Sequence, residues 1–424
     1  PNDYYLVGQW FPKIGVFEKN LKGVWAWNCH QFHANSEFYA DFGKYKMSLT
    51  VPQNLVVGAT GNRVSETMLK NGFKNVVYEV DDVHDFAWTA SPEFVAFEKK
   101  WNQVTLKALM QPEHAGQHKR YFDAAEKSLS YFEKVLGRYP YKTLTLVDPP
   151  IAASGSGGME YATFVTCGAY YGVGTWLKMA EVVTVHEFGH QYFQGMLASN
   201  EFEQAFLDEG FNQYMENKVM DESYGKGSNL DLFGFQIGDR ESTRFSYVTM
   251  DYPELSEINR PTWKYPKGVY GDLTYTKTAT VLATFENLVG RKKMDAVLKN
   301  YFQKWQFKHP KLSDFTSSAN RVLGKNYDWF FSQAFEKSYS CDYKVDTLRN
   351  ISGKGYFTLS RIGKFMIPAE VQVNFKDGSS ELFTWDARSI LKKYEYPKNI
   401  TSVMIDPQKK NLMDLNLVNN SYTL

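Results

Sequence analysis

The sequence predicts a multi-domain α+β protein whose parts follow in the order β, α/β, α and β. Apolar and polar residues alternate near both ends of the chain, as they do in half-buried strands. In the middle of the chain, apolar residues recur every three or four positions, as they do in amphipathic helices. A chain of 424 residues is also too long for one simple core, because most domains have about 100 to 150 residues.

Residues 1–100 predict a partial β-sheet domain at the amino terminus. The segment Lys46–Pro52 alternates polar and apolar residues and stops at a proline, as an exposed strand does. The segment Leu55–Asn62 repeats this pattern, and its last two residues, Gly61 and Asn62, are typical of a turn. The chain starts at Pro1 without a signal-peptide pattern, so we expect a processed or truncated start.

Residues 101–225 predict an α/β unit. An amphipathic helix ended by Gly137 is indicated by apolar residues at spacings of three and four, namely Tyr121, Ala124, Ala125, Leu129, Phe132 and Leu136. The segment Leu144–Asp148 follows as a short buried strand. Two further helices are expected over residues 176–197 and 203–222, each apolar on one side. The order helix, strand, helix is typical of an α/β or α+β catalytic unit.

Residues 226–342 predict the helical part of this region. A loop-rich stretch with Pro253, Pro261 and Pro266 leads to helix from Tyr275 to about residue 335. Within it, Gly290 closes a run of apolar residues at helical spacing, Val281, Leu282, Phe285 and Leu288.

Residues 343–424 predict a small β-sandwich-like carboxy-terminal domain. The segment Val371–Phe375 alternates polar and apolar residues. The three residues Lys376, Asp377 and Gly378 then predict a hairpin turn before the strand Glu381–Trp385.

The composition excludes several classes of protein. The net charge is +1, from 48 basic and 47 acidic residues, which gives no electrostatic reason to expect nucleic acid or an anionic membrane as partner. No apolar run approaches the roughly 20 residues that span a bilayer. Cys29, Cys167 and Cys341 lie far apart without CxxC spacing, so neither a disulfide framework nor a thiolate zinc site is indicated. Whether any pair is bonded stays open, as does the oligomeric state.

The expected helix 176–197 carries His186-Glu187-Phe188-Gly189-His190. Residues four apart on an α-helix are separated by about 40° around its axis, so both imidazoles project from one face and can reach one zinc ion. Glu187 leans toward the same side without binding the metal. It can take a proton from the attacking water and pass it to the leaving amine.

Catalytic zinc requires three protein ligands and an open fourth position. Glu209 lies 18 intervening residues past His190, near the start of the next expected helix. A short loop and a reversed helix can return it to the two histidines. Glu216 lies two turns further along the same face, which makes it a candidate hydrogen-bond acceptor for a ligand imidazole.

Three motifs in order then match a known family. His186, Glu187, His190 and Glu209 meet the signature His-Glu-x-x-His, eighteen residues, Glu. The family's Gly-x-Met-Glu-Asn motif has its counterpart in Gly157-Gly158-Met159-Glu160-Tyr161, and its Tyr-x-Lys-Gly-Ala element in Tyr275-Thr276-Lys277-Thr278-Ala279. Over residues 140–290 the chain resembles the gluzincin aminopeptidases, the family of membrane alanyl aminopeptidase and leukotriene hydrolase. Asp208 departs from the family, which has Asn before the third ligand.

The resemblance implies a thermolysin-like catalytic domain that holds one Zn²⁺ and removes amino-terminal residues from peptides with a free amino terminus. Glu160 would accept the α-ammonium of the substrate. Gly157, Gly158 and Met159 would pair with its backbone. Tyr275 would donate its hydroxyl to the oxyanion that develops on the attacked carbonyl.

Other interpretations stay open from the residues alone. A zinc endopeptidase of the thermolysin type would use a similar ligand set without the amine-binding Glu160. A non-catalytic binding protein on the same fold is a second alternative. Tyr161, Tyr192 and the segment 194–196 depart from the family, so the preferred first residue of the substrate stays undetermined. Localisation stays open between an exported and a cytoplasmic protein, although the aromatic segments near residues 10–12 and 41–43 are similar to exported bacterial members.

Overall fold

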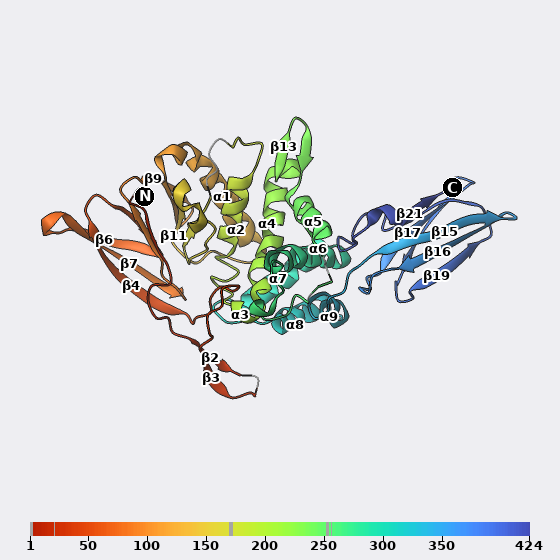
Figure 1. Ribbon diagram of the computed structural model, residues 1–424, viewed down its shortest axis with the longest axis horizontal. Helices are drawn as coiled ribbons and strands as arrows, with labels where there is room; N and C mark the ends of the chain where they lie inside the picture. The colour runs from red at the N-terminus through yellow and green to blue at the C-terminus, as the bar shows by residue number, and fades with distance from the viewer. Residues whose placement is uncertain (1–2, 21, 169–172, 252–253, 256) are drawn as a thin grey trace. The chain divides into compact units, whose positions relative to one another are not determined.

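The computed structural model describes residues 3–20, 22–168, 173–251, 254–255 and 257–424 (Figure 1). The expectations about Pro1 and Pro253 lie outside these residues. The chain divides into two compact units. The first unit comprises Pro1–Ser242 and Leu298–Asp314, and the second comprises Thr243–Val297 and Phe315–Leu424. The domain boundaries at residues 100, 225 and 342 stay a prediction.

The predicted mixed α/β architecture, with a β-rich amino-terminal region and a helical segment, is confirmed. The strands of the amino-terminal region are β1 (Tyr5–Val7), β2 (Val16–Lys19), β3 (Trp25–Asn28), β4 (Gly43–Pro52), β5 (Val56–Ala59), β6 (Asn62–Met68), β7 (Phe73–Val83), β8 (Trp88–Ser91), β9 (Val95–Trp101) and β10 (Val104–Met110), with η1 (Lys70–Gly72) before β7. They form the antiparallel sheets β4-β7-β6 and β1-β8-β5 and the hairpin β2-β3. Gly61, at φ +86°, makes the turn that was predicted between β5 and β6.

Alternation along these strands places their apolar residues in one buried cluster, as period-two patterning requires. The cluster consists of Leu49, Val51, Leu55, Ala59, Val76, Tyr78, Phe86 and Ala90. A second cluster joins this β region to the next sheet of the same unit through Ala87, Phe94, Leu109, Val147 and Phe164.

The next sheet has the order β12-β11-β10-β9 and supports the helices that carry the chemistry. Strand β10 pairs parallel with β11 (Thr143–Val147), and β11 pairs parallel with β12 (Phe164–Thr166). The connection between β10 and β11 contains η2 (Pro112–Gln117) and the amphipathic helix α1 (His118–Val135), since parallel neighbours need a long crossover. The helix predicted over residues 119–136 and the strand predicted over 144–148 are therefore confirmed.

The helix predicted over residues 176–197 is shorter than expected. Helix α2 spans Met179–Gly189, and the chain then turns back on itself, with Gln194 at φ +80° and Gly195 donating its N–H to the His190 carbonyl at 2.7 Å. The prediction was wrong past Gly189 because the apolar residues that follow are buried in these turns and not on a helix face: Tyr192, Phe193, Met196 and Leu197. The helix predicted over 203–222 is replaced by α3 (Glu201–Gln204), η4 (Ala205–Leu207) and α4 (Glu209–Tyr224).

Glycine at position 189 is required by the packing of α2 against α4. A Cβ there would lie 1.8 Å from Oδ1 of Asn212, a residue of α4. The Asn212 side chain also donates to the His186 carbonyl at 2.7 Å. This close approach ends α2 and fixes the spacing of the two helices that supply the candidate ligands.

The remaining elements continue the predicted order. They are η3 (Ile151–Ser156), η5 (Gly225–Gly227), β13 (Leu230–Leu232), β14 (Phe235–Ile237), α5 (Asp239–Thr249), η6 (Thr262–Lys264), the π-helical η7 (Asp272–Lys277), α6 (Thr278–Val289), α7 (Arg291–Trp305), α8 (Leu312–Leu323) and α9 (Asp328–Phe335). Gly290 ends α6 at φ +93°, as expected. Among the described residues, no helix is long and apolar enough to cross a membrane.

Two antiparallel sheets follow in the second unit. Their orders are β15-β16-β19 and β18-β17-β20-β21. The strands are β15 (Tyr343–Ile351), β16 (Lys354–Arg361), β17 (Ala369–Phe375), β18 (Ser380–Trp385), β19 (Leu391–Tyr396), β20 (Ile400–Ile405) and β21 (Ser421–Thr423), with η8 (Leu417–Asn420) before β21. Gly378, at φ +83°, makes the predicted hairpin turn between β17 and β18. Cys29, Cys167 and Cys341 are free thiols.

A buried histidine joins the amino-terminal β region to the turns after α2. His84 follows β7 and donates from Nε2 to the Gln194 carbonyl at 3.0 Å, and the ring of Phe42 packs edge-on against it. Burial, together with the charge of Lys13, lowers the pKa of His84 to about 4, so the imidazole is neutral in the folded protein near neutral pH.

We expect His84 to make the first unit sensitive to acid. In the unfolded chain a histidine titrates near its ordinary pKa of about 6.5, so the unfolded state gains a proton before the folded state as the pH falls. The contribution of His84 to the free energy of unfolding should therefore be fully present above pH 6.5. It should be lost as the pH drops toward 4, which lowers the free energy of unfolding by on the order of 2 to 3 kcal/mol. Urea unfolding at pH 7.0 and 4.5 measures this loss. The His84→Gln variant keeps a donor for the Gln194 carbonyl but cannot titrate. Its free energy of unfolding should therefore fall less between pH 7.0 and 4.5 than that of the parent protein. An equal loss in both proteins would contradict the assignment.

Candidate active site

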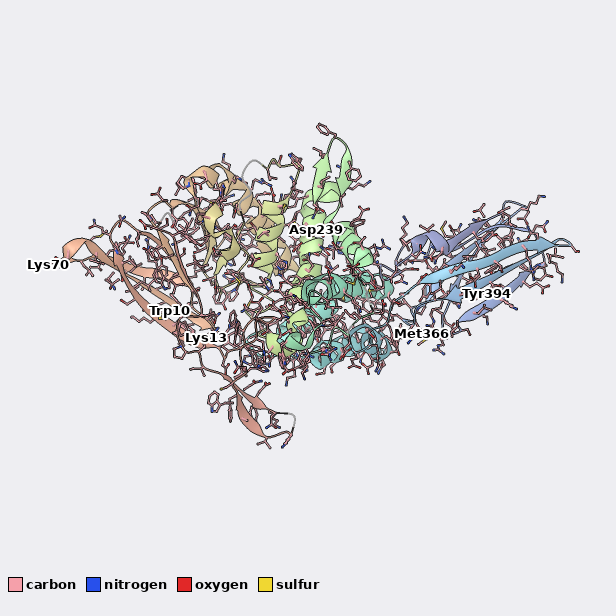
Figure 2. The ribbon with its side chains drawn as sticks, viewed as in Figure 1. Trp10, Lys13, Lys70, Asp239, Met366 and Tyr394 are labelled. Carbon is pink, nitrogen blue, oxygen red and sulfur yellow. The ribbon has the colours of Figure 1, made fainter. Side chains whose placement is uncertain are left out.

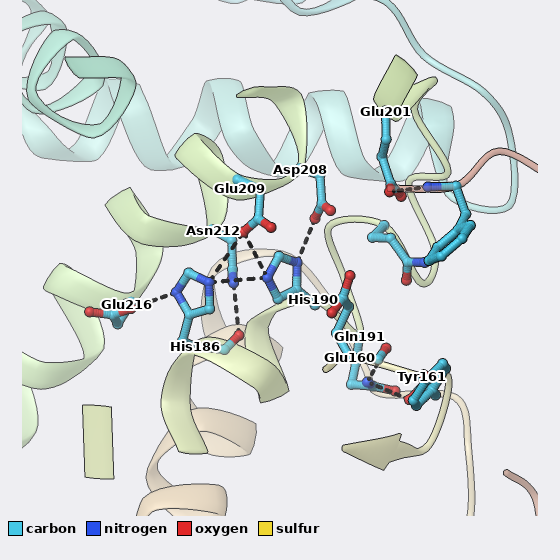
Figure 3. Close-up of polar contacts among 12 residues, drawn as sticks. Glu160, Tyr161, His186, His190, Gln191, Glu201, Asp208, Glu209, Asn212 and Glu216 are labelled. Carbon is cyan, nitrogen blue, oxygen red and sulfur yellow. Dashed lines mark hydrogen bonds and ion pairs between the residues drawn. The ribbon is translucent and has the colours of Figure 1, made fainter. Parts of the chain in front are cut away.

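The three predicted ligand residues meet at one point in the first unit (Figure 3). His186 lies in the last turn of α2, His190 directly follows that helix, and Glu209 is the first residue of α4. Nε2 of His186 lies 3.1 Å from Nε2 of His190, and Oε2 of Glu209 lies 3.3 and 3.1 Å from these two nitrogens. Three ligand atoms on a tetrahedral zinc, with bonds of about 2.0 Å, would lie about 3.3 Å apart. The donor set therefore fits a zinc ion.

The other nitrogen of each imidazole is held by a carboxylate. Nδ1 of His186 donates to Glu216 Oε2 at 2.6 Å, which is the contact predicted for Glu216. Nδ1 of His190 donates to Asp208 Oδ1 at 2.5 Å. If each neutral ring carries its hydrogen on this outer nitrogen, both Nε2 lone pairs face the Glu209 carboxylate. Three acceptors converging in a buried space need a cation between them.

The pKa shifts of these groups also indicate that positive charge is favoured at this point. Burial alone would lower the pKa of His186, but its hydrogen bonds with Glu209 and Glu216 raise it to about 10. The pKa of His190 rises well above its ordinary value because the charges of Asp208 and Glu209 outweigh the effect of burial. The pKa of Glu209 is lowered, since the two imidazoles outweigh the burial of its carboxyl. The negative charge gathered around these ring nitrogens therefore favours a proton or a metal ion at the same point, and the two would compete for it.

Glu187 lies on α2 beside the ligand atoms. It is buried, and its Oε2 has no hydrogen-bond partner among the described residues. Burial raises the pKa of Glu187 to about 7, against the lowering effect of His186 and His190. A carboxyl group that titrates near neutral pH is suited to take up and release a proton.

The segment of residues 157–160 runs past Glu187 as an additional edge of the sheet. Met159 pairs with Thr166 in an antiparallel bridge, and Gly158 donates to the Thr166 carbonyl at 2.7 Å. Gly158 has φ +72°, and a Cβ built there would lie 3.7 Å from Oε1 of Glu187. A Cβ on Gly157 would lie 2.7 Å from the Cys167 carbonyl. Both glycines thus allow the segment to lie flat between β12 and the base.

Glu160 ends this segment inside the site. Its carboxylate, that of Glu187 and a ring nitrogen of His190 all lie within 4.8 Å of one another. Burial raises the pKa of Glu160 well above its ordinary value, and the nearby Glu37, Glu209 and Asp208 add to this. The structure thus brings together the predicted residues from the segment 157–160, α2 and the start of α4.

Two residues of the site were missed in the sequence. Asp208 was noted only as a departure from a family pattern, although its position next to Glu209 places it on the same helix start. Glu37 precedes β4 and lies near Glu209 and Asp208, and burial together with these two carboxylates raises its pKa to about 8. The neighbouring Phe38 N–H donates to Glu201 Oε2 at 2.7 Å (Figure 3). No spacing rule links residue 37 to residues more than a hundred positions away.

Tyr275 lies in the second unit. It belongs to η7, and its ring packs edge-on against Tyr270 at 6.2 Å. Single π-helical turns inside helices are frequent at functional sites. The role of Tyr275 at the candidate metal site stays a prediction.

We expect the first unit to be stabilised by zinc. Removing metal with a chelator should lower the midpoint of thermal unfolding by about 5 to 10 °C, relative to protein with zinc at about 100 times its Kd. Differential scanning calorimetry measures the difference. Glu209→Gln should abolish most of it, whereas Glu222→Gln, an exposed position on the same helix, should keep it. A Glu209→Gln protein that gains as much from zinc as the parent would contradict the ligand set.

Comparison with known proteins relates this site to one family. The family model described as "Peptidase family M1 domain" matches residues 120–334, which is half of the chain. "Probable aminopeptidase 2" of Sulfurisphaera tokodaii is 22% identical over 312 residues, covering 70% of this chain and 39% of that protein. Human "Endoplasmic reticulum aminopeptidase 2" is 24% identical over 277 residues, covering 62% of this chain and 27% of that protein. The chain thus spans well under half the length of these relatives.

A solved structure shares the fold. Aminopeptidase A of Legionella pneumophila, crystallised in complex with aspartic acid, superposes with a TM-score of 0.66 at 15% sequence identity. The match covers 89% of this chain and 46% of the Legionella chain. This likeness shows the fold and extends beyond the residues that the family model matches.

Proposed function

The chain belongs to the M1 family of peptidases, and on this premise we propose that it is a zinc-dependent aminopeptidase that hydrolyses the amino-terminal peptide bond of peptides. The observation that carries this proposal is the convergence of His186, His190 and Glu209 on one point beside the unpartnered carboxyl oxygen of Glu187. The named relatives that match the chain are aminopeptidases. We assign the site to a thermolysin-like catalytic domain that begins near residue 101.

Glu187 is the general base of this proposal. A zinc ion held by the three ligands would supply Lewis-acid chemistry, polarising the scissile carbonyl and acidifying a water molecule. Glu187 would accept the proton of the attacking water and then deliver it to the amine that leaves. Its burial supports both steps, because a carboxyl with a pKa near 7 exchanges a proton at little cost.

Glu160 and Glu37 are proposed to bind the α-ammonium group of the substrate. Both carboxyls have raised pKa values, because Glu160 is buried, Glu37 is half-buried, and both lie near the other carboxylates of the site. An ammonium ion offers the positive charge and the N–H donors that this excess of acceptors lacks. Gly157, Gly158 and Met159 would then pair with the substrate backbone. The peptide would lie along this edge with its scissile carbonyl beside Glu187.

Tyr275 is proposed to donate its hydroxyl to the oxyanion of the attacked carbonyl. The proposal rests on the match of residues 275–279 to the family element and on the π-helical turn that presents the tyrosine. The endopeptidase alternative is less well supported, since such an enzyme has no use for buried carboxyls where a free amine would bind. A purely binding protein is also less well supported, because the ligands and the base are all present.

Replacing the base tests the mechanism. We expect Glu187→Gln to retain zinc and to lower kcat on amino-acid arylamides by at least about a thousandfold, since proton transfer to a positioned carboxylate is lost. Tyr275→Phe in the same assay should lower kcat with little change in KM, because the hydroxyl acts on the transition state. Undiminished turnover of the Glu187→Gln protein would refute the mechanism, and undiminished turnover of Tyr275→Phe would refute only the role of Tyr275.

Blocking the substrate amine tests the aminopeptidase assignment. We expect amino-acid arylamides to be cleaved and their N-acetylated forms to resist cleavage, because acetylation removes the charge that Glu160 and Glu37 bind. Glu160→Gln should raise KM for the free-amine substrate by at least about tenfold, the loss of one charge-assisted hydrogen bond. Glu113→Gln, a change at an exposed carboxyl outside the site, is the control. Equal rates on free and acetylated substrates would show an endopeptidase.

A further inference from the structure

The residue after the second candidate ligand makes hydrogen bonds to the backbone of a distant segment. Gln191 follows His190 and is fully buried (Figure 3). Its Oε1 accepts a hydrogen bond from the Thr163 N–H at 2.6 Å. Its Nε2 donates to the Tyr161 carbonyl at 3.2 Å and, at the longer distance of 3.5 Å, to the Glu160 carbonyl. One side-chain amide thus holds the chain immediately after Glu160 to the turn that carries His190.

The segment that Gln191 holds is a tight turn between two antiparallel stretches. Met159 forms a bridge with Thr166 of β12. The Phe164 N–H donates to the Tyr161 carbonyl at 2.9 Å, so the chain reverses its direction between residues 161 and 164. Glu160 is the last residue before this reversal. Because β12 also pairs with β11 inside the sheet, the position of the turn decides where Glu160 lies.

The turn contains a strained residue. Thr163 has φ +58°, a left-handed conformation that β-branched residues rarely adopt. Such a conformation persists only where the surrounding contacts hold it. The Thr163 carbonyl accepts from the Thr145 N–H of β11 at 2.8 Å, and its hydroxyl accepts from the Gly61 N–H at 2.7 Å. These contacts hold the turn to the β region, whereas Gln191 holds it to the end of α2.

A neutral amide suits this position. A backbone N–H only donates and a backbone carbonyl only accepts, so a side chain that serves both must offer an acceptor and a donor, as glutamine does. A leucine or methionine at position 191 would fill a similar space and make neither hydrogen bond. The buried Thr163 N–H would then lose this acceptor, which favours a shift of the turn.

The position of the turn matters because the site must match a single residue of the substrate. In a peptide, one Cα atom joins the α-amine to the first carbonyl carbon, so the distance between them is nearly fixed. Under the proposed function, Glu160 binds the amine while the carbonyl lies at the metal. A carboxylate oxygen of Glu160 lies within 4.8 Å of a ring nitrogen of His190. A shift of the turn would change this separation and weaken the binding of the amine.

We propose that Gln191 is a positioning residue for the substrate amine, whose side-chain amide holds the turn of residues 161–164 to the end of α2 and thereby fixes the Glu160 carboxyl relative to the zinc ligands. The inference deepens the proposed function and rests on it, since the position of Glu160 matters only if Glu160 binds the α-ammonium group. Gln191 acts through the backbone of the turn and is not a catalytic residue.

Steady-state kinetics and zinc affinity of the full chain test this role. We expect Gln191→Leu to raise KM for amino-acid arylamides by at least about fivefold and to change kcat by less than about threefold, because the weakened interaction binds substrate and transition state alike. The Kd for Zn²⁺, measured by competition with a chromophoric chelator, should change by less than the roughly tenfold loss that follows removal of a ligand's own hydrogen-bond partner. The control is Gln53→Leu, an exposed glutamine whose N–H donates to Gly72 of η1, where Figure 2 labels Lys70.

A double variant shows whether Gln191 acts through Glu160. In a Glu160→Ala background the carboxyl to be positioned is absent, so Gln191→Leu should raise KM further by less than about twofold. A general loss of structure would instead change KM by the same factor in both backgrounds. Should Gln191→Leu fail to fold, Gln191→Met takes its place, since its unbranched side chain has a length similar to that of glutamine.

The outcomes separate this proposal from the proposed function. A parental KM in the folded Gln191→Leu or Gln191→Met protein would overturn the role of Gln191, as would a loss of kcat or of zinc affinity as large as the change in KM. An equal rise in KM in the Glu160→Ala background would overturn the route through Glu160. These results leave the aminopeptidase assignment in place, since the parent protein still cleaves free-amine arylamides. A parent protein that cleaves none of them would overturn the proposed function and the role of Gln191 together.

Discussion

The structure depends on one electrostatic constraint, the convergence of three hydrogen-bond acceptors in a buried space. Nε2 of His186, Nε2 of His190 and a Glu209 oxygen lie 3.1 to 3.3 Å apart, so with neutral imidazoles they repel one another unless a cation lies between them. The fold must hold them together against that repulsion. It does so by ending α2 at Gly189, where Asn212 of α4 approaches closely, and by holding the outer nitrogen of each imidazole with a carboxylate.

The convergence of the candidate ligands could be predicted from the sequence because their relation is local. Four residues on a helix fix the directions of His186 and His190, and seven residues on the next helix relate Glu209 to Glu216. We also expected the segment between α2 and α4 to bring Glu209 back to the two histidines, and Glu209 does lie beside them. The end of α2 could not be predicted, since the apolar residues after Gly189 continue a helical spacing while they pack into turns.

Residues brought in by tertiary structure escaped the sequence. Glu37 precedes a strand of the amino-terminal β region, so no periodicity connects it to the motif on α2. Alternation predicted strands such as β4 and β17 well, because it reports which face is buried. Alternation does not show which strands pair with each other. The order β12-β11-β10-β9, which places the segment 157–160 beside Glu187, could therefore not be predicted from it.

The sequence also does not show which carboxyl groups have raised pKa values and which have lowered ones. Near the metal site the same residue type takes two states. Glu209 faces both imidazoles and its pKa is lowered, whereas loss of contact with water raises the pKa of Glu37 and Glu160 against the lowering effect of His190. The difference follows from the neighbouring groups, because Glu160 and Glu209 are the same residue type and are both buried. Under the proposed function, the two ends of the site would bind different ligands, a metal ion beside the imidazoles and an ammonium group near Glu37 and Glu160. A peptide substrate would then present its free amino terminus to the carboxyls and its first carbonyl to the metal ion.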